Sequence, residues 1–323
     1  MMHMPPCGSI RGMPLIETYA ITKQYPAVRA LDDFSVEIDP GLTGIVGSNG
    51  AGKSTLIKIL LGLLPPTSGT ATVLDYDIHR DGPTLRQYVG YLPEHDCLPG
   101  DMTATEFVSH MAQVSGLPGA AARERTAETL RHVGLFEERY RHLAGYSTGM
   151  KQRVKLAQAL VHDPKIIFLD EPTNGLDPAG RDEMLDLIRK IGIEFGISML
   201  FCTHLLGEIE RTCDHLVVID AGKLVKSAPL AEFTQEVESL RVEIDGDATP
   251  VLAQLEAAGI SVESEDRRFI KVSYEGQPPF DAIRDAVVEA EAGLIRIEQR
   301  RNTLEDLFRT ETTGANLEED ARV

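Results

Sequence analysis

The sequence predicts an α/β fold with a mixed β-sheet core, an antiparallel β part, a helical part and a second, smaller α+β domain. Three observations carry this prediction. Residues 16–21 and 34–39 alternate apolar and polar side chains, as antiparallel strands do. Two continuous apolar runs, 165–170 and 197–204, flank a helical segment, which indicates a parallel βαβ unit. Residues 231–323 repeat strands and helices on a smaller scale.

The elements up to residue 94 are predicted from their patterns. Residues 42–47, LTGIVG, form a buried strand that runs into a glycine-rich loop. The segment 54–64 has helical length and composition, and it stops before Pro65-Pro66. Residues 70–78 and 88–94 are predicted to form a further strand pair around a polar turn.

Helices are predicted over residues 101–162, where apolar residues recur at helical spacing and glycines stand near the segment ends. The helix between the two apolar runs covers residues 179–196. A hairpin is predicted at 215–227, with Ala221 and Gly222 in its turn.

The tail is predicted to form strand, helix, strand, strand, helix, strand and helix, the last helix starting at residue 303. Its first helix is expected to have Thr249 as N-cap and Pro250 in the first turn. We therefore predict one domain over residues 14–230 and a small acidic α+β domain over residues 231–323.

Composition limits the possible functions. At 323 residues the chain is long enough for two domains, since single cores rarely exceed roughly 250–300 residues. The net charge is −18, and residues 231–323, with 22 acidic and 10 basic side chains, contribute −12 of it. This excess of acid repels phosphate backbones and anionic lipids, which argues against a general nucleic-acid-binding function.

The cysteines and the apolar runs predict where the chain works. The four cysteines are Cys7, Cys97, Cys202 and Cys213. They show neither CxxC pairing nor metal-ligand spacing, which predicts free thiols in a reducing compartment. No apolar run approaches the roughly 18–20 residues of a membrane span, and the N-terminus lacks a signal-peptide core. We expect a cytoplasmic protein with a disordered extension over residues 1–13, Met13 being a candidate start.

The stretch GSNGAGKST fits the pattern G-x-x-x-x-G-K-[ST], between a predicted strand and a predicted helix. Its residues are Gly47, Ser48, Asn49, Gly50, Ala51, Gly52, Lys53, Ser54 and Thr55. Glycines let backbone N–H groups encircle phosphate oxygens, Lys53 can reach the β- and γ-phosphates, and Ser54 can coordinate Mg²⁺. The alternative is a glycine-rich turn that binds nothing, and the flanking elements disfavour it. The pattern predicts a P-loop nucleoside triphosphatase (NTPase).

An acidic pair and a histidine follow the two apolar runs. Asp170 emerges at the carboxyl edge of the predicted sheet, where it can hold the Mg²⁺ shell through water. Glu171 is placed to polarise an attacking water. Alone, such a pair indicates only a strand end or an N-cap, but a P-loop in the same sheet favours the catalytic interpretation. His204 ends the neighbouring strand; a lone histidine there is more often structural, yet its edge position favours a γ-phosphate contact.

Residues 146–153, YSTGMKQR, decide among P-loop ATPases. With VKLAQALVHDPKIIFLDEPTNGLD after it, this stretch resembles the signature region of the ATP-binding-cassette (ABC) transporter family, whose usual core is L-S-G-G-Q. The resemblance covers about residues 16–226. It implies a P-loop NTPase fold with a mixed sheet core, an antiparallel β subdomain and a helical signature subdomain. It also implies hydrolysis of ATP with Mg²⁺.

In that family two cassettes pack head to tail, and each ATP lies between one P-loop and the other subunit's signature. The resemblance implies that Ser147 and Gly149 contact the γ-phosphate of a second subunit, which we expect to be another copy of this chain. Free N–H groups at a helix start suit this role. Asp177 is implied to line the opposing site. Tyr25 is implied to stack on adenine, with an ordinary turn aromatic as the alternative. Glu94 occupies a position usually held by Gln, which links γ-phosphate, Mg²⁺ and the membrane subunit.

The sequence also departs from the family pattern. A carboxylate at Glu94 can accept from metal-bound water but cannot donate a hydrogen bond, which leaves open whether it is a metal ligand. In the signature, Tyr146, Thr148 and Met150 replace Leu, Gly and Gln. Signatures of the Y-S-x-G-M type, together with NTLEDLF at 302–308, resemble the exporter branch in which ATPase and permease are separate polypeptides.

Two functions follow from these observations. The first is an ATPase subunit held at the inner face of the cell membrane by an integral permease, which docks on the Glu94 region and residues 101–162 and exports a drug, ion, lipid or polysaccharide. The second is a soluble cassette protein that acts on ribosomes or chromosomes. Such proteins usually carry two cassettes or a long coiled-coil insertion, and neither is present, so the first is favoured. The tail is expected to help hold the dimer, with substrate gating as the alternative.

Overall fold

The computed structural model describes residues 14–234, 238–274 and 276–300. The chain divides into two compact units, the first ending at Pro229 and the second beginning at Leu230. The extension expected over residues 1–13 and the helix expected from residue 303 lie outside the described residues.

The first unit contains a four-stranded antiparallel sheet of order β2-β1-β4-β5. Its strands are β1 (Ile16–Gln24), β2 (Arg29–Ile38), β4 (Ser68–Val73) and β5 (Tyr76–Asp77). The single strand predicted over 70–78 is wrong, because a turn at Leu74 and Asp75 separates β4 from β5. Both turn residues have positive φ, 52° and 65°, which a continuous strand does not allow.

The second sheet of this unit has six strands in the order β10-β9-β3-β8-β7-β6. They are β3 (Leu42–Val46), β6 (Val89–Leu92), β7 (Ile166–Asp170), β8 (Ser198–Thr203), β9 (His215–Asp220) and β10 (Lys223–Pro229). β9, β3, β8, β7 and β6 run parallel, and β10 is antiparallel to β9. The strand predicted at 88–94 therefore pairs with β7 and not with residues 70–78, so the predicted pair is wrong.

Parallel strand order places the chemistry at one edge. Every residue of β3, β7 and β8 is buried, as expected for strands covered on both faces. The carboxyl ends of these three neighbours lead into the P-loop, Glu171 and His204 respectively. The predicted βαβ unit is confirmed, and so is the 215–227 hairpin, whose turn residues Ala221 and Gly222 both have positive φ.

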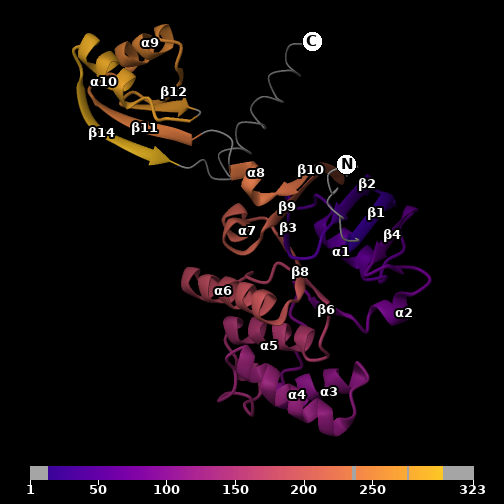
Figure 1. Cartoon of the computed structure of the whole chain (residues 1–323). Helices are drawn as coiled ribbons and strands as arrows, with labels where there is room; N and C mark the ends of the chain where they lie inside the picture. The colour runs from indigo at the N-terminus through magenta and orange to yellow at the C-terminus, as the bar shows by residue number, and fades with distance from the viewer. Residues whose placement is uncertain (1–13, 235–237, 275, 301–323) are drawn as a thin grey trace, which may run out of the picture. The chain divides into compact units, whose positions relative to one another are not determined.

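Helices complete the first unit. They are α1 (Lys53–Leu60), α2 (Gly82–Leu85), α3 (Ala104–Val114), α4 (Gly119–His132), the 3₁₀ helix η1 (Leu143–Gly145), α5 (Thr148–Leu160), α6 (Pro178–Phe195) and α7 (Leu206–Thr212). α3, α4 and α5 pack against one another as a helical group, drawn in magenta in Figure 1. Phe34 of β2, Leu56 of α1 and Phe168 of β7 belong to one buried cluster, so α1 and both sheets share a core that fixes the P-loop.

The second unit starts with α8 (Leu230–Thr234) and has its own sheet, of order β12-β13-β11-β14. Its other elements are β11 (Glu238–Asp245), α9 (Thr249–Ala257), β12 (Ser261–Asp266), β13 (Phe269–Tyr274), α10 (Phe280–Glu289) and β14 (Gly293–Arg300). Leu240, Val251 and Ile283 belong to a separate buried cluster. The N-cap predicted at Thr249 is wrong: Ala248 is the cap, and the Asp247 carboxylate accepts from the Thr249 N–H at 3.0 Å.

None of the helices in the described parts of the chain is both long and apolar enough to cross a membrane.

Candidate nucleotide site

The P-loop lines a cavity of ≈ 220 Å³ between β3 and α1. The lining residues are Ala30, Asn49, Gly50, Gly52, Lys53, Ser54, Thr55, Glu94 and Glu171. Glu94 and Glu171 therefore lie at the P-loop, as the sequence predicts. Lys53 is the single basic side chain among these lining residues, and the two glutamates are acidic.

Glycines shape this loop because neighbouring backbone leaves no room for side chains. A Cβ on Gly47 would lie 2.2 Å from the Ile219 carbonyl oxygen, and one on Gly52 would lie 2.4 Å from that of Ala30. Gly52 also has a φ of +109° and precedes α1 as its N-cap, without a side-chain hydrogen bond. The N–H groups of the first turn of α1 are thus available to an anion.

Lys53 lies against the loop itself. Its Nζ donates to the carbonyl oxygen of Gly47 at 2.6 Å and to that of Ser48 at 3.2 Å. The Lys53 side chain is buried, so water screens its positive charge only weakly at the P-loop cavity. Two of the three ammonium N–H donors are used in these bonds, so one remains for an anion in the cavity that Lys53 lines.

Ser54 and Asp170 come together across α1 and β7. The Ser54 hydroxyl donates to Asp170 Oδ1 at 3.1 Å, and the carboxylate is 2% exposed. Burial raises the pKa of Asp170; the Ser54 hydrogen bond opposes this rise, and the Glu94 and Glu171 charges add to it. A cation here would relieve the repulsion among these carboxylates. Hydroxyl and carboxylate oxygens are the donors that Mg²⁺ accepts.

Glu171 and His204 form a second pair at this edge. Nδ1 of His204 lies 3.0 Å from both Oε1 and Oε2 of Glu171. An ionised carboxylate only accepts hydrogen bonds, so the Nδ1 N–H of His204 is the donor in this contact. Glu171 is held by its N–H bond to the Cys202 carbonyl oxygen at 2.9 Å and has a φ of +49°.

The buried carboxylate of Glu208 links the segments that carry Glu171 and His204. The sequence analysis did not indicate this residue. Glu208 of α7 accepts from the hydroxyls of Thr173 and Thr203, each at 2.7 Å. Thr173 lies two residues after Glu171, and Thr203 directly precedes His204. Glu208 therefore fixes both loops. No sequence signal marked it, since an acidic residue in the first turn of a helix normally faces solvent.

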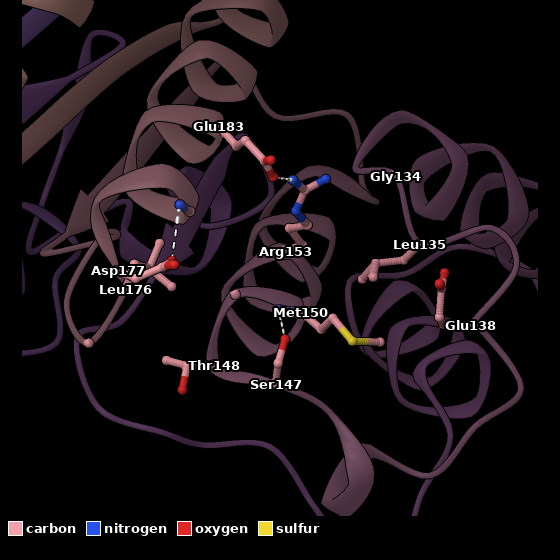
Figure 2. Close-up of a pocket in the computed structure, with 13 residues that line it drawn as sticks. Gly134, Leu135, Glu138, Ser147, Thr148, Met150, Arg153, Leu176, Asp177 and Glu183 are labelled. Atoms are coloured by element: carbon pink, nitrogen blue, oxygen red, sulfur yellow. Dashed lines mark hydrogen bonds and ion pairs between the residues drawn. The ribbon is translucent and has the colours of Figure 1, made fainter.

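The signature residues line a different cavity, of ≈ 510 Å³ (Figure 2). Its lining residues are Gly134, Leu135, Glu138, Ser147, Thr148, Gly149, Met150, Arg153, Gly175, Leu176, Asp177, Gly180 and Glu183. Ser147 is the N-cap of α5, its hydroxyl accepting from the Met150 N–H at 3.3 Å. Asp177 is the N-cap of α6 and accepts from the Gly180 N–H at 3.1 Å. Two long helices thus begin at one cavity, with their positive ends toward it.

The two cavities share no lining residue. Ser147, Gly149 and Asp177 are therefore not brought to the chain's own P-loop. Tyr25 lines neither cavity; its ring centroid lies 5.4 Å from Lys23 Nζ, at the turn between β1 and β2. Ala30, just after that turn, does line the P-loop cavity.

Comparison with known proteins identifies the family. A family model described as ABC transporter matches residues 31–174. The daunorubicin/doxorubicin resistance ATP-binding protein DrrA of Streptomyces peucetius is 36% identical to this chain, over 69% of the chain and 68% of its own length. The chain belongs to the ABC transporter ATP-binding proteins. It is thus an ABC ATPase, and the family predicted from the signature region is confirmed.

Two further similarities extend this assignment. The Nod factor export ATP-binding protein I of Ralstonia nicotianae is 31% identical and covers 95% of this ABC ATPase and 96% of itself, which includes the second unit. The structure of cbiO1 from Clostridium perfringens, described as part of an ABC transporter complex, superposes with a TM-score of 0.63 at 29% identity. It covers 68% of this chain and 90% of its own. The transporter ATPase is therefore favoured over the soluble cassette alternative.

Proposed function

We propose that this ABC ATPase powers export through a separate membrane permease, and that two copies of the chain must meet to build each hydrolytic site. One observation carries the second part. The P-loop cavity and the signature cavity are both present but have no residue in common, which supports a hydrolytic site of which each cavity supplies half and which a second subunit completes. Export is supported by the names of the drug resistance and Nod factor relatives.

The P-loop cavity would bind the phosphates of ATP. Residues 47–55 surround them with N–H groups, and Lys53 supplies the positive charge. Ser54 and Asp170 offer the oxygen donors for Mg²⁺, which would neutralise phosphate charge when bound. Glu94 lines the same cavity, and its carboxylate can accept a hydrogen bond from a water of the metal shell.

Hydrolysis would use the Glu171–His204 pair. Glu171 accepts the proton of the attacking water, and His204, held through Nδ1, keeps the carboxylate oriented and contacts the γ-phosphate side. Glu208 fixes the position of the segments that carry Glu171 and His204, because it accepts hydrogen bonds from the hydroxyls of Thr173 and Thr203.

The second subunit would close the site. Ser147, Gly149 and the start of α5 present N–H groups and a positive helix end to the γ-phosphate bound by the partner. Asp177 lines the same face. Tyr25 lies in the turn between β1 and β2, shortly before Ala30 of the P-loop cavity lining, and adenine would stack on its ring.

The remaining proposals concern partners and location. The permease would dock on the Glu94 region and the helical group of α3, α4 and α5, which holds the chain at the inner face of the membrane. Residues 231–323 would form an accessory domain, separate from the cassette of residues 14–230, and this domain would help to hold the dimer. Its own buried core supports independent folding.

Purification of the tagged full chain from detergent-solubilised membranes of its own cells tests this function. A multi-span hydrophobic protein without an ATP-binding domain is expected in equal amount, and the complex in lipid vesicles should hydrolyse ATP. The same chain lacking its tag is the control. Recovery of the chain in the ribosome fraction, with no membrane protein attached, would favour the soluble alternative instead.

A further inference from the structure

A lysine of the signature helix holds the loop that carries Glu94. Lys155 of α5 donates from Nζ to the backbone carbonyl oxygens of Pro93 at 2.6 Å, Glu94 at 3.2 Å and His95 at 3.3 Å. These residues belong to the Glu94 loop, defined here as residues 93–97, which leaves the end of β6. An ammonium has three donors, and all three find an acceptor in this one loop.

The burial of Lys155 makes this contact difficult to break. The side chain is 2% exposed, and a buried charge is costly unless its hydrogen bonds are satisfied. If the Glu94 loop moved away from α5, the ammonium would lose its three acceptors inside the protein. The loop and the helix are therefore expected to move as one body.

A second, weaker contact lies one helical turn earlier. Lys151 Nζ is 3.0 Å from Asp96 Oδ2, and their side chains are 34% and 54% exposed. Exposed ion pairs contribute little on their own. Both lysines nevertheless lie on α5 and bind the same loop. The strand before the loop also packs closely on α5: a Cβ on Gly90 of β6 would lie 2.2 Å from the Ala159 carbonyl oxygen of α5.

The contact between Lys155 and the Glu94 loop connects the P-loop cavity and the signature cavity of one chain, which are called its two half-sites. Glu94 lines the P-loop cavity, whereas α5 begins at Ser147 in the signature cavity. We propose that Lys155 is a positioning residue that holds the Glu94 loop in register with α5, so that Glu94 stays at the P-loop cavity and follows any movement of the signature end. This inference rests on the proposed function for its effect on catalysis, but not for its effect on the loop.

The loop contains its own reporter, which allows a test independent of activity. Cys97 is exposed, whereas Cys202 and Cys213 are buried. In full-length chain with Cys7→Ser, a thiol reagent therefore reports on the Glu94 loop. Partial burial raises the pKa of Cys97 and the Lys155 charge opposes this rise, so rates are compared per thiolate, taken from the pH dependence of the reaction. On that basis Lys155→Met should raise the reaction rate of Cys97 by about fivefold or more, since a released loop opens more often. Lys190→Met, an exposed site on α6, is the matched control and should leave the rate unchanged.

Kinetics of the same variants separate positioning from general damage. Lys155→Met should lower kcat for ATP hydrolysis by about tenfold or more, because a small misplacement of a catalytic group is that costly. Binding of a fluorescent ATP analogue should change by less than about twofold, since Lys53 and the P-loop are intact. If Lys155→Met does not fold, Lys151→Met should show a smaller rise in Cys97 reactivity and a smaller loss of kcat.

The outcomes are distinguishable. An unchanged Cys97 rate in Lys155→Met, or equal losses of kcat and ATP binding, would overturn the proposal. A faster Cys97 with a selective loss of kcat supports it. A faster Cys97 in a chain whose unsubstituted form hydrolyses no ATP, even with its permease, supports the contact between Lys155 and the loop and overturns the proposed function.

Discussion

Replacing Glu171 by Gln is expected to lower ATP hydrolysis by about 10²–10⁴-fold, the range lost when a general base is removed. The amide has nearly the same shape as the carboxylate and can still accept from His204 Nδ1, so the geometry of the pair should survive. The proton acceptor alone is lost. Phosphate release at saturating Mg-ATP measures kcat, and a fluorescent ATP analogue measures binding, which should remain intact.

The same variant should accumulate as an ATP-bound dimer, because in the proposed function ATP joins two subunits and hydrolysis separates them. Size-exclusion chromatography with and without Mg-ATP measures this change. Glu194→Gln, which alters an exposed glutamate on α6, is the matched control and should retain normal turnover. Normal turnover in Glu171→Gln itself would exclude Glu171 as the base.

Replacing Lys53 by Ala is expected to weaken ATP binding by about 100-fold, since a charge-assisted hydrogen bond is worth that order of affinity in a buried site. The local charge explains the size of the effect. Lys53 is the single basic side chain among the residues that line the P-loop cavity, and Glu94 and Glu171 line it too. Without Lys53, the phosphates would face two carboxylates and no opposing side-chain charge.

The control for this prediction lies on the same helix. Lys58 is exposed near the end of α1, so Lys58→Ala removes an equal charge without entering the cavity. Equilibrium titration with the fluorescent analogue should give near-normal affinity for Lys58→Ala. Similar affinities for Lys53→Ala and the unsubstituted chain would mean that Lys53 does not contact the nucleotide.

The parts of the fold that the sequence predicted correctly are those marked by a pattern of neighbouring residues. Continuous apolar runs at 165–170 and 197–204 indicated β7 and β8, and the P-loop pattern is contiguous in sequence. The split of 70–78 was not predictable, because Leu74 and Asp75 take positive φ without a glycine to signal it. The cap of α9 was misplaced because Asp247, two residues earlier, supplies the accepting carboxylate.

The candidate site shows the same limit. Sequence motifs indicated part of each lining, such as Lys53 and Glu171 in one cavity and Ser147 in the other, since each motif keeps its members close along the chain. They did not indicate Ala30 or Glu138, which come from other segments. Nor did they indicate Lys155 or Glu208, whose burial arises from tertiary contacts with residues about 60 and 35 positions away. On a helix, a lysine or a glutamate is expected by default to have a solvated side chain. Only the packed structure distinguishes the two cases.

Mixing two inactive variants tests the central claim most directly. Lys53→Ala disables the P-loop half-site, and Ser147→Arg fills the signature half-site, so each variant alone should be inactive. Mixed in equal amounts, they should regain about a quarter of normal ATPase activity, because half of random dimers pair the two variants and each such dimer has one complete site. Activity that stays at zero at every mixing ratio, or full activity of Ser147→Arg by itself, would contradict a site shared between subunits.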